Sequence, residues 1–209
     1  MQVVTSPLLA VQFFTPVLPP RGWRAVILTS ETGAMAAGRI KSSLPDLAFC
    51  VGDTTAQAAL TAGFSPRSAR GDTEALLSLI LSDPNPPLLH LRGQDVRGDI
   101  TKRLLASGIE ACDLAVYAQN KQPLTPEATA LLQGQTPILV PLFSPRSAEI
   151  FGAEYRRIGA TAPVTVVAMS PAVADVVLRF GVMVEVAPHP DGQTMLQAVV
   201  NLLEAGQGA

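Results

Sequence analysis

The chain has 209 residues, of which 48% are hydrophobic and 15% charged, and this balance excludes an intrinsically disordered protein. The 15 Lys and Arg residues against 17 Asp and Glu give a formal net charge of −2, without the basic excess that a non-specific nucleic-acid binder carries. The sequence has no apolar run of about 18 residues, no basic leader and only 2 cysteines, which predicts a cytoplasmic protein without a membrane span or a disulfide framework.

Short apolar runs alternate with helical stretches along the chain. In the first half, the runs at 25–28, 47–51 and 88–91 each lead into a helical stretch. In the second half, the runs at 138–143 and 164–169 lead to Ser-Pro, a pair that suits the N-cap and the first position of a helix. Buried strands that alternate with helices predict parallel sheets covered on both faces, which is an α/β fold.

The polar residues that precede the helices recur in both halves of the chain. They are Ser30, Asp53 and Asp72 in the first half and Ser144, Ser170 and Asp191 in the second. Corresponding residues lie about 115 residues apart, a period far too long for a solenoid, so we predict two similar α/β domains. The Ser-Pro-Arg-Ser sequence at 65–68 and at 144–147 does not fall at matching places in the halves, and we interpret this identity as coincidence.

Two Pro-containing stretches, 13–20 and 119–126, predict that the chain crosses twice between the domains. The middle domain then spans residues 13–118, and residues 1–12 with 119–209 form a discontinuous terminal domain. No sustained heptad pattern is present, so we expect a monomer.

Common catalytic signatures are missing from the sequence. His90 lies inside an apolar run and His189 in an Ala-Pro-His-Pro turn, and neither has Cys, His or carboxylate neighbours at metal-ligand spacing. We therefore interpret both as structural histidines, and we expect Cys50 and Cys112, which also lie in apolar runs, to be buried and inert. There is no phosphate-binding loop, dinucleotide-binding glycine turn or nucleophile elbow.

The N-termini of the predicted helices remain as candidate binding sites. They follow the carboxyl ends of parallel strands, where backbone N–H groups and the helix dipole attract carboxylates or phosphates. We predict that they line one cleft between the domains, with basic residues near the same edges. The basic residues are Arg92, Arg97, Lys102 and Arg146. The alternatives at these positions are plain N-capping without a ligand and solvated surface charges.

Seven motifs follow one another in a recognisable order and together cover about residues 6–203. They are Ile27–Ser30, Val51–Ala56, Leu91–Gly93, Leu104–Gly108, Ala115–Tyr117, Phe143–Ser147 and Ala168–Ala174. In this order and spacing the chain resembles the uroporphyrinogen-III synthase family. The resemblance implies two flavodoxin-like parallel-sheet α/β domains joined by a two-stranded connection, with the terminal domain discontinuous and incomplete.

The resemblance also implies a reaction. It is the cyclisation of hydroxymethylbilane, a linear tetrapyrrole with eight carboxylates, to uroporphyrinogen III, with inversion of the D ring and loss of water. This is a hydro-lyase reaction of haem-type tetrapyrrole biosynthesis that uses no metal or organic cofactor and has neither nucleic acid nor membrane as partner. Tyr117 matches the family tyrosine that is favoured to assist departure of the hydroxyl group. The implied substrate-binding residues are Ser30, Thr32, Asp53, Thr55, Arg92, Ser144, Arg146 and Ser170.

Two departures from the family pattern leave other functions open. Family members usually have a strand, a turn and a helix before the segment that here is 3–9, so we expect a terminal domain with fewer strands than the middle one. A later hydroxyl-bearing position of the family is Val173 here. The alternatives are a non-catalytic homologue and a two-domain module that binds anionic ligands.

Overall fold

The computed structural model describes residues 2–95 and 98–206. Its contacts divide the chain into a middle unit, Val11–Asn120, and a terminal unit made of Met1–Ala10 and Lys121–Ala209. The chain passes between the units inside two neighbouring strands, β1 (Leu9–Phe13) and β6 (Ala111–Lys121). The contacts place the limits of the middle unit two residues outside the predicted limits, 13 and 118. The exact domain boundaries therefore stay a prediction.

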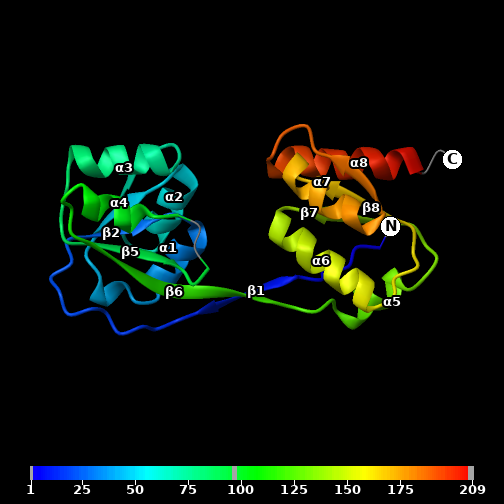
Figure 1. Cartoon of the computed structure of the whole chain (residues 1–209), viewed down its shortest axis with the longest axis horizontal. Helices are drawn as coiled ribbons and strands as arrows, with labels where there is room; N and C mark the ends of the chain where they lie inside the picture. The colour runs from blue at the N-terminus through cyan, green and yellow to red at the C-terminus, as the bar shows by residue number, and fades with distance from the viewer. Residues whose placement is uncertain (1, 96–97, 207–209) are drawn as a thin grey trace. The chain divides into compact units, whose positions relative to one another are not determined.

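The middle unit is built on a six-stranded sheet with helices on both faces (Figure 1). The strand order is β1-β6-β5-β2-β3-β4, and the neighbours from β6 to β4 are parallel. The remaining strands are β2 (Ala25–Leu28), β3 (Leu47–Cys50), β4 (Ser65–Ser68) and β5 (Leu88–Gly93). The helices are α1 (Glu31–Gly38), the 3-10 turn η1 (Lys41–Ser43), α2 (Asp53–Thr61), α3 (Thr73–Ser82) and α4 (Ile100–Ala106).

The two faces of this sheet carry separate apolar clusters. Val26 and Leu28 of β2 pack with residues of α1 and α2, whereas Ala25 and Ile27 pack with residues of α3 and α4. All four side chains are fully buried, as the continuous apolar run in a two-sided parallel sheet predicts.

The strand order also contains a switch in direction between β2 and β5. From β2 the chain adds β3 and β4 on one side, and it then returns to add β5 and β6 on the other. In doubly wound sheets, ligands bind outside the carboxyl ends of the strands at such a switch point.

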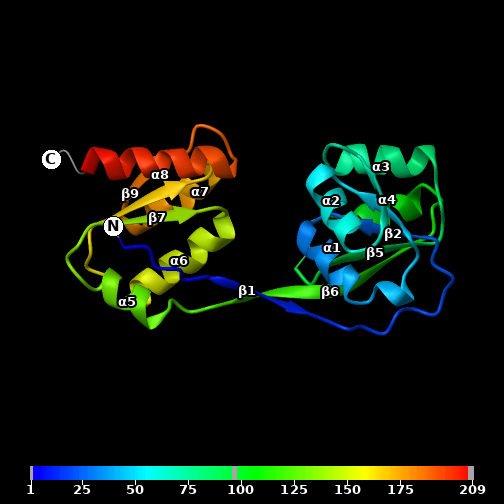
Figure 2. The ribbon, with the colours of Figure 1, turned by 180° about the vertical axis from the view of Figure 1, so that it is seen from behind.

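The terminal unit contains a parallel sheet of three strands in the order β7-β8-β9 (Figure 2). These are β7 (Ile138–Leu142), β8 (Val164–Ala168) and β9 (Met183–Val186). The helices are α5 (Pro126–Leu132), α6 (Pro145–Arg157), α7 (Pro171–Val177), the 3-10 turn η2 (Leu178–Phe180) and α8 (Gly192–Gly206). Helices α6 and α7 share one apolar cluster with the sheet, and Met195 of α8 belongs to another. The α/β class and the smaller terminal sheet are therefore confirmed.

Most of the predicted helix caps are confirmed by hydrogen bonds. Ser30 Oγ accepts from Gly33 N–H at 3.0 Å, and Asp72 Oδ1 accepts from two backbone N–H groups of α3. Ser144 forms a capping box with Ser147 at the start of α6. Each bond satisfies an N–H group that the helix itself leaves unpaired.

Two predicted caps differ from the structure. Asp53 is not the N-cap of α2, because the extended backbone of Gly52 occupies that place and its carbonyl accepts from Ala56 N–H at 3.0 Å. Asp53 is the first helical residue, and its exposed carboxylate lies 3.8 Å from Arg70 Nε. Ser170 occupies the N-cap of α7, but its side chain makes no capping hydrogen bond.

The repeated Ser-Pro-Arg-Ser sequence is coincidence, as predicted. At 65–68 it forms β4 at the edge of the larger sheet, and at 144–147 it is the cap and first turn of α6. An edge strand tolerates Pro66 because one side of it needs no ladder hydrogen bond.

The cysteines differ from each other in their surroundings. Cys50 is buried in β3, and burial raises the pKa of its thiol to about 12, which agrees with an inert residue. Cys112 is half-buried, so the prediction that it is buried is wrong. In the part of the chain that the structure describes, no helix is both long and apolar enough to cross a membrane.

Candidate functional site

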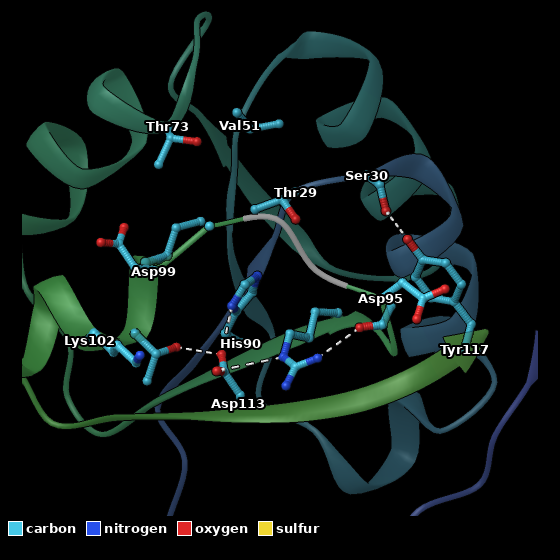
Figure 3. Close-up of a pocket in the computed structure, with 15 residues that line it drawn as sticks. Thr29, Ser30, Val51, Thr73, His90, Asp95, Asp99, Lys102, Asp113 and Tyr117 are labelled. Atoms are coloured by element: carbon cyan, nitrogen blue, oxygen red, sulfur yellow. Dashed lines mark hydrogen bonds and ion pairs between the residues drawn. The ribbon is translucent and has the colours of Figure 1, made fainter. Parts of the chain in front are cut away.

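A cavity of about 360 Å³ lies in the middle unit at the carboxyl ends of β2 and β5, where the strand order switches (Figure 3). Residues that follow or end the strands contribute to its lining, as do residues at the start of α4. The polar side chains that bear on its chemistry are those of Ser30, His90, Arg92, Thr101, Asp113 and Tyr117. The cavity therefore occupies the place where sheets of this type bind their ligands.

Tyr117 and Ser30 meet at one end of this cavity. The Tyr117 Oη lies 3.1 Å from Ser30 Oγ, and both side chains are half-buried. Gly93 makes room for the phenol ring, because a Cβ atom at this position would lie 2.9 Å from Tyr117 Cζ. Gly93 and Ser30 thus hold the phenol at the carboxyl ends of the strands.

A register shift in the ladder between β5 and β6 precedes this contact. Arg92 pairs with Ala115, but Gly93 pairs with Tyr117, so Val116 is an extra residue in β6. Bulges of this kind re-aim the neighbouring side chains and are common next to functional sites. Here the residue after the bulge is the one whose hydroxyl reaches Ser30.

A second group of polar side chains lines the same cavity. His90 in β5 is 3% exposed, and its Nδ1 lies 2.9 Å from Oδ1 of Asp113 in β6. Thr101 Oγ1 of α4 donates to the same carboxylate oxygen at 2.5 Å, and Arg92 Nε lies 3.6 Å from the other oxygen. Figure 3 shows the Asp113 carboxylate facing the imidazole of His90, with a dashed line that marks their contact.

These contacts determine the pKa of Asp113. The hydrogen bond with His90, followed by those with Thr101 and the charge of Arg92, lowers the pKa of the carboxyl from 3.8 to about 2 against the opposing effect of burial. The Asp113 carboxylate is therefore ionised at neutral pH and acts only as a hydrogen-bond acceptor.

We expect Asp113 to make the free energy of unfolding depend on pH in the acidic range. Because its pKa is lower in the folded than in the unfolded chain, its contribution is fully present above about pH 4 and is lost as the pH falls to about 2. The free energy of unfolding of Asp113→Asn should fall less steeply than that of the parent over this range, as measured by denaturant titration. An Asp113 carboxyl that titrates by NMR near pH 4 in the folded parent would contradict this.

The charge in the cavity is mixed. Arg92 and Lys102 line it together with Asp95, Asp99 and Asp113. Arg92 is half-buried, and its Nη1 donates to the backbone carbonyls of Gly93 and Gln94. Among the described residues no group of three or more His, Cys, Asp and Glu side chains could hold a metal ion. A reaction without a cofactor stays a prediction.

The structure brings together only some of the predicted site residues. Ser30, Arg92 and Tyr117 line the cavity, whereas Thr32, Asp53 and Thr55 of the same unit do not. Thr55 is 6% exposed within α2. Arg97 lies outside the described residues.

The other three predicted residues belong to the terminal unit. Ser144 and Ser170 follow the ends of β7 and β8, where Leu142 pairs with Ala168, and Arg146 is in the first turn of α6. Val173, which replaces a hydroxyl-bearing residue of the family pattern, is buried in the core of this unit. The predicted cleft between the domains stays a prediction.

The sequence interpretation missed the pair of His90 and Asp113. It found no carboxylate near His90 because Asp113 is 23 residues away in the chain, yet the two residues are direct partners across β5 and β6. A usable signal was present, since each apolar strand carries one polar residue at its third position, in Leu88-Leu89-His90 and Ala111-Cys112-Asp113.

A comparison with protein families decides the relationship. The family described as uroporphyrinogen-III synthase HemD matches residues 1–197. The chain belongs to the uroporphyrinogen-III synthase family. This family serves porphyrin biosynthesis, and the resemblance carried by the seven sequence motifs is thereby confirmed. No curated protein matches the chain.

Solved structures of this family's enzymes are also similar to the chain. The uroporphyrinogen-III synthetase of Helicobacter pylori 26695 is 17% identical with a TM-score of 0.71, and the match covers 93% of this chain and 91% of that one. A mutant uroporphyrinogen III synthase from the extremely thermophilic bacterium Thermus thermophilus is 17% identical with a TM-score of 0.48, and the match covers 95% and 88% of the two chains. The likeness to the Helicobacter structure shows that the fold is shared.

Proposed function

We propose that this chain catalyses the cyclisation of hydroxymethylbilane to uroporphyrinogen III, with inversion of the D ring and loss of water. Membership of the uroporphyrinogen-III synthase family supports the reaction. The observation in the molecule that carries the proposal is the Tyr117 hydroxyl, which lies beside Ser30 at the switch-point cavity.

The chemistry that we propose for the site is mostly positional. The hydroxymethyl group ionises readily, and the bilane also closes without an enzyme, although without inversion of ring D. The enzyme must hold the A and D rings so that the substituted carbon of ring D is attacked, which gives a spiro intermediate. Holding reacting ends in place can contribute on the order of 7–11 kcal/mol.

Tyr117 is the proposed catalytic residue. Its phenol O–H would give its proton to the departing hydroxyl, which leaves as water with the electron pair of the C–O bond, and the phenolate would regain the proton that the substrate releases on cyclisation. Ser30 Oγ would keep the phenol oriented. The proposed substrate-binding residues of the middle unit are Ser30 and Arg92 at the cavity and, outside its lining, Thr32, Asp53 and Thr55. Ser144, Arg146 and Ser170 are proposed to bind substrate at the edge of the smaller sheet. The reaction requires no cofactor in this proposal, and we expect a cytoplasmic monomer.

The test is the isomer composition of the product. Hydroxymethylbilane formed in situ is incubated with the purified chain, and the oxidised uroporphyrins are separated chromatographically. We expect isomer III in excess over the isomer I that forms without enzyme. A product that is purely isomer I would overturn the proposal and favour a non-catalytic homologue or an anion-binding module.

A further inference from the structure

One buried polar atom of the cavity has no role in the proposed chemistry. The imidazole of His90 is 3% exposed and lines the cavity, and its Nε2 has no hydrogen-bond partner within residues 2–95 and 98–206. In Figure 3 one ring nitrogen meets Asp113, and the other points away from it, towards the side of Thr29. Buried polar atoms in folded proteins nearly always have a hydrogen-bond partner, so we expect a group bound in the cavity to be the partner of Nε2.

The contacts of Asp113 determine what His90 Nε2 can offer. The ionised carboxylate can only accept a hydrogen bond, so in the neutral form of the imidazole the proton resides on Nδ1. Thr101 Oγ1 donates to the same carboxylate oxygen, and Arg92 Nε lies 3.6 Å from the other oxygen. In this tautomer Nε2 is a bare acceptor whose direction is fixed by the hydrogen bond on the other side of the ring.

An acceptor buried in such a cavity selects a ligand with an N–H or O–H donor. A pyrrole ring has one N–H donor and no acceptor opposite it, and it carries its acid side chains on the far edge of the ring. The acid side chains of the pyrrole would then contact charged groups away from His90, such as Lys102, which lines the same cavity. A cavity of about 360 Å³ falls in the size range of small-ligand pockets and would take part of a tetrapyrrole.

We propose that His90 Nε2 accepts a hydrogen bond from a pyrrole N–H of the tetrapyrrole, and that Asp113 is the positioning residue that keeps the imidazole in the accepting tautomer. This inference rests on the proposed function and names the group that orients one ring in the site. His90 and Tyr117 then have different tasks. His90 binds a ring, and Tyr117 acts on the leaving hydroxyl.

The direct test uses a bilane with a methyl group in place of the hydroxymethyl group, which binds without cyclising. With ¹⁵N-labelled histidine, NMR reports which nitrogen of each imidazole carries a proton, and the chain has only 2 histidines to assign. We expect the Nε2 of His90 to be unprotonated before and after the bilane is added, and its resonance to shift on binding. A proton gained by Nε2 on binding would overturn the proposal, because the partner would then be a carboxylate.

Variants test the same point by affinity. His90→Leu should weaken binding of this bilane about tenfold, because one hydrogen bond is lost in a buried place. His189→Leu, at an exposed turn of the terminal unit, is the matched control and should bind as the parent does. In Asp113→Asn the amide can donate to Nδ1 and move the proton to Nε2, so binding should weaken while NMR shows the reversed tautomer.

The outcomes separate the two proposals. If the parent forms isomer III but the His90 resonance does not respond and His90→Leu binds normally, the role of His90 is overturned and the proposed function stands. If the parent neither binds the bilane nor forms isomer III, both are overturned. Because the NMR experiment uses the parent chain, it remains decisive even where His90→Leu fails to fold.

Discussion

Replacing Tyr117 by Phe should lower the turnover of hydroxymethylbilane by about 10²- to 10⁴-fold, the range of general acid catalysis. The substitution removes the hydroxyl that lies 3.1 Å from Ser30 Oγ and keeps the ring that packs against Gly93. The fold should persist, because the loss of one half-buried hydrogen bond costs only about 1 kcal/mol. The measurement is the initial rate of uroporphyrinogen III formation beside the melting temperature of the same preparation.

The isomer composition separates chemistry from positioning in this variant. Product formed by Tyr117→Phe should still be mainly isomer III, because ring orientation depends on the binding groups and not on the phenol. Tyr155→Phe is the matched control, since Tyr155 is the other tyrosine of the chain, packs against Phe151 in α6 and is not among the residues that line the cavity. Full activity in a well-folded Tyr117→Phe would reduce Tyr117 to a packing residue.

The local signals in the sequence predicted the order of the elements well. Ser30, Asp72 and Ser144 were placed correctly at helix starts because capping is a contact between residues two or three positions apart. The glycines at 63, 108, 159 and 181, each shortly after the end of a helix, all have positive φ angles, so glycine is a local signal for helix ends here. At Asp53 the prediction was wrong by one residue, since Gly52 can also take the extended cap conformation.

Strand pairing and register lie beyond such local signals. Residues 65–68 contain no apolar residue except Pro66, so no alternation predicts β4, and the strand forms because β3 offers it a partner. The pair of His90 and Asp113 depends on the parallel register of β5 and β6, which aligns two residues that are 23 positions apart.

The position of Tyr117 was predicted from a motif, but its surroundings were not. The extra residue Val116 shifts the register just before Tyr117, and Gly93 provides the space for its ring. Neither the shift nor the contact with Ser30, 87 residues earlier in the chain, has a signature in the sequence. The site therefore emerges only when the β2, β5 and β6 strands lie side by side.

Among substitutions in the middle unit, which carries the site, we expect one of the largest losses of stability at Phe49. This side chain is fully buried in β3 and packs with Ile27, Leu76 and Leu104 on the face of the sheet that α3 and α4 cover. Phe49→Ala should lower the free energy of unfolding of the middle unit by about 3–5 kcal/mol, because it removes apolar contacts and leaves a cavity. That is a large part of the roughly 5–15 kcal/mol that a domain has in total.

Because α4 carries Thr101, a partner of Asp113, loosening this face should also disturb the site. Urea denaturation followed by circular dichroism measures the loss, with two controls. Phe49→Leu keeps most of the volume and should cost less than about 1.5 kcal/mol. Phe143→Ala removes a side chain that is 54% exposed in the terminal unit and should stay within about 0.5 kcal/mol of the parent. Equal losses in Phe49→Ala and Phe143→Ala would contradict the packing of α3 and α4 on this face, since only a closed core makes the first substitution the costlier one.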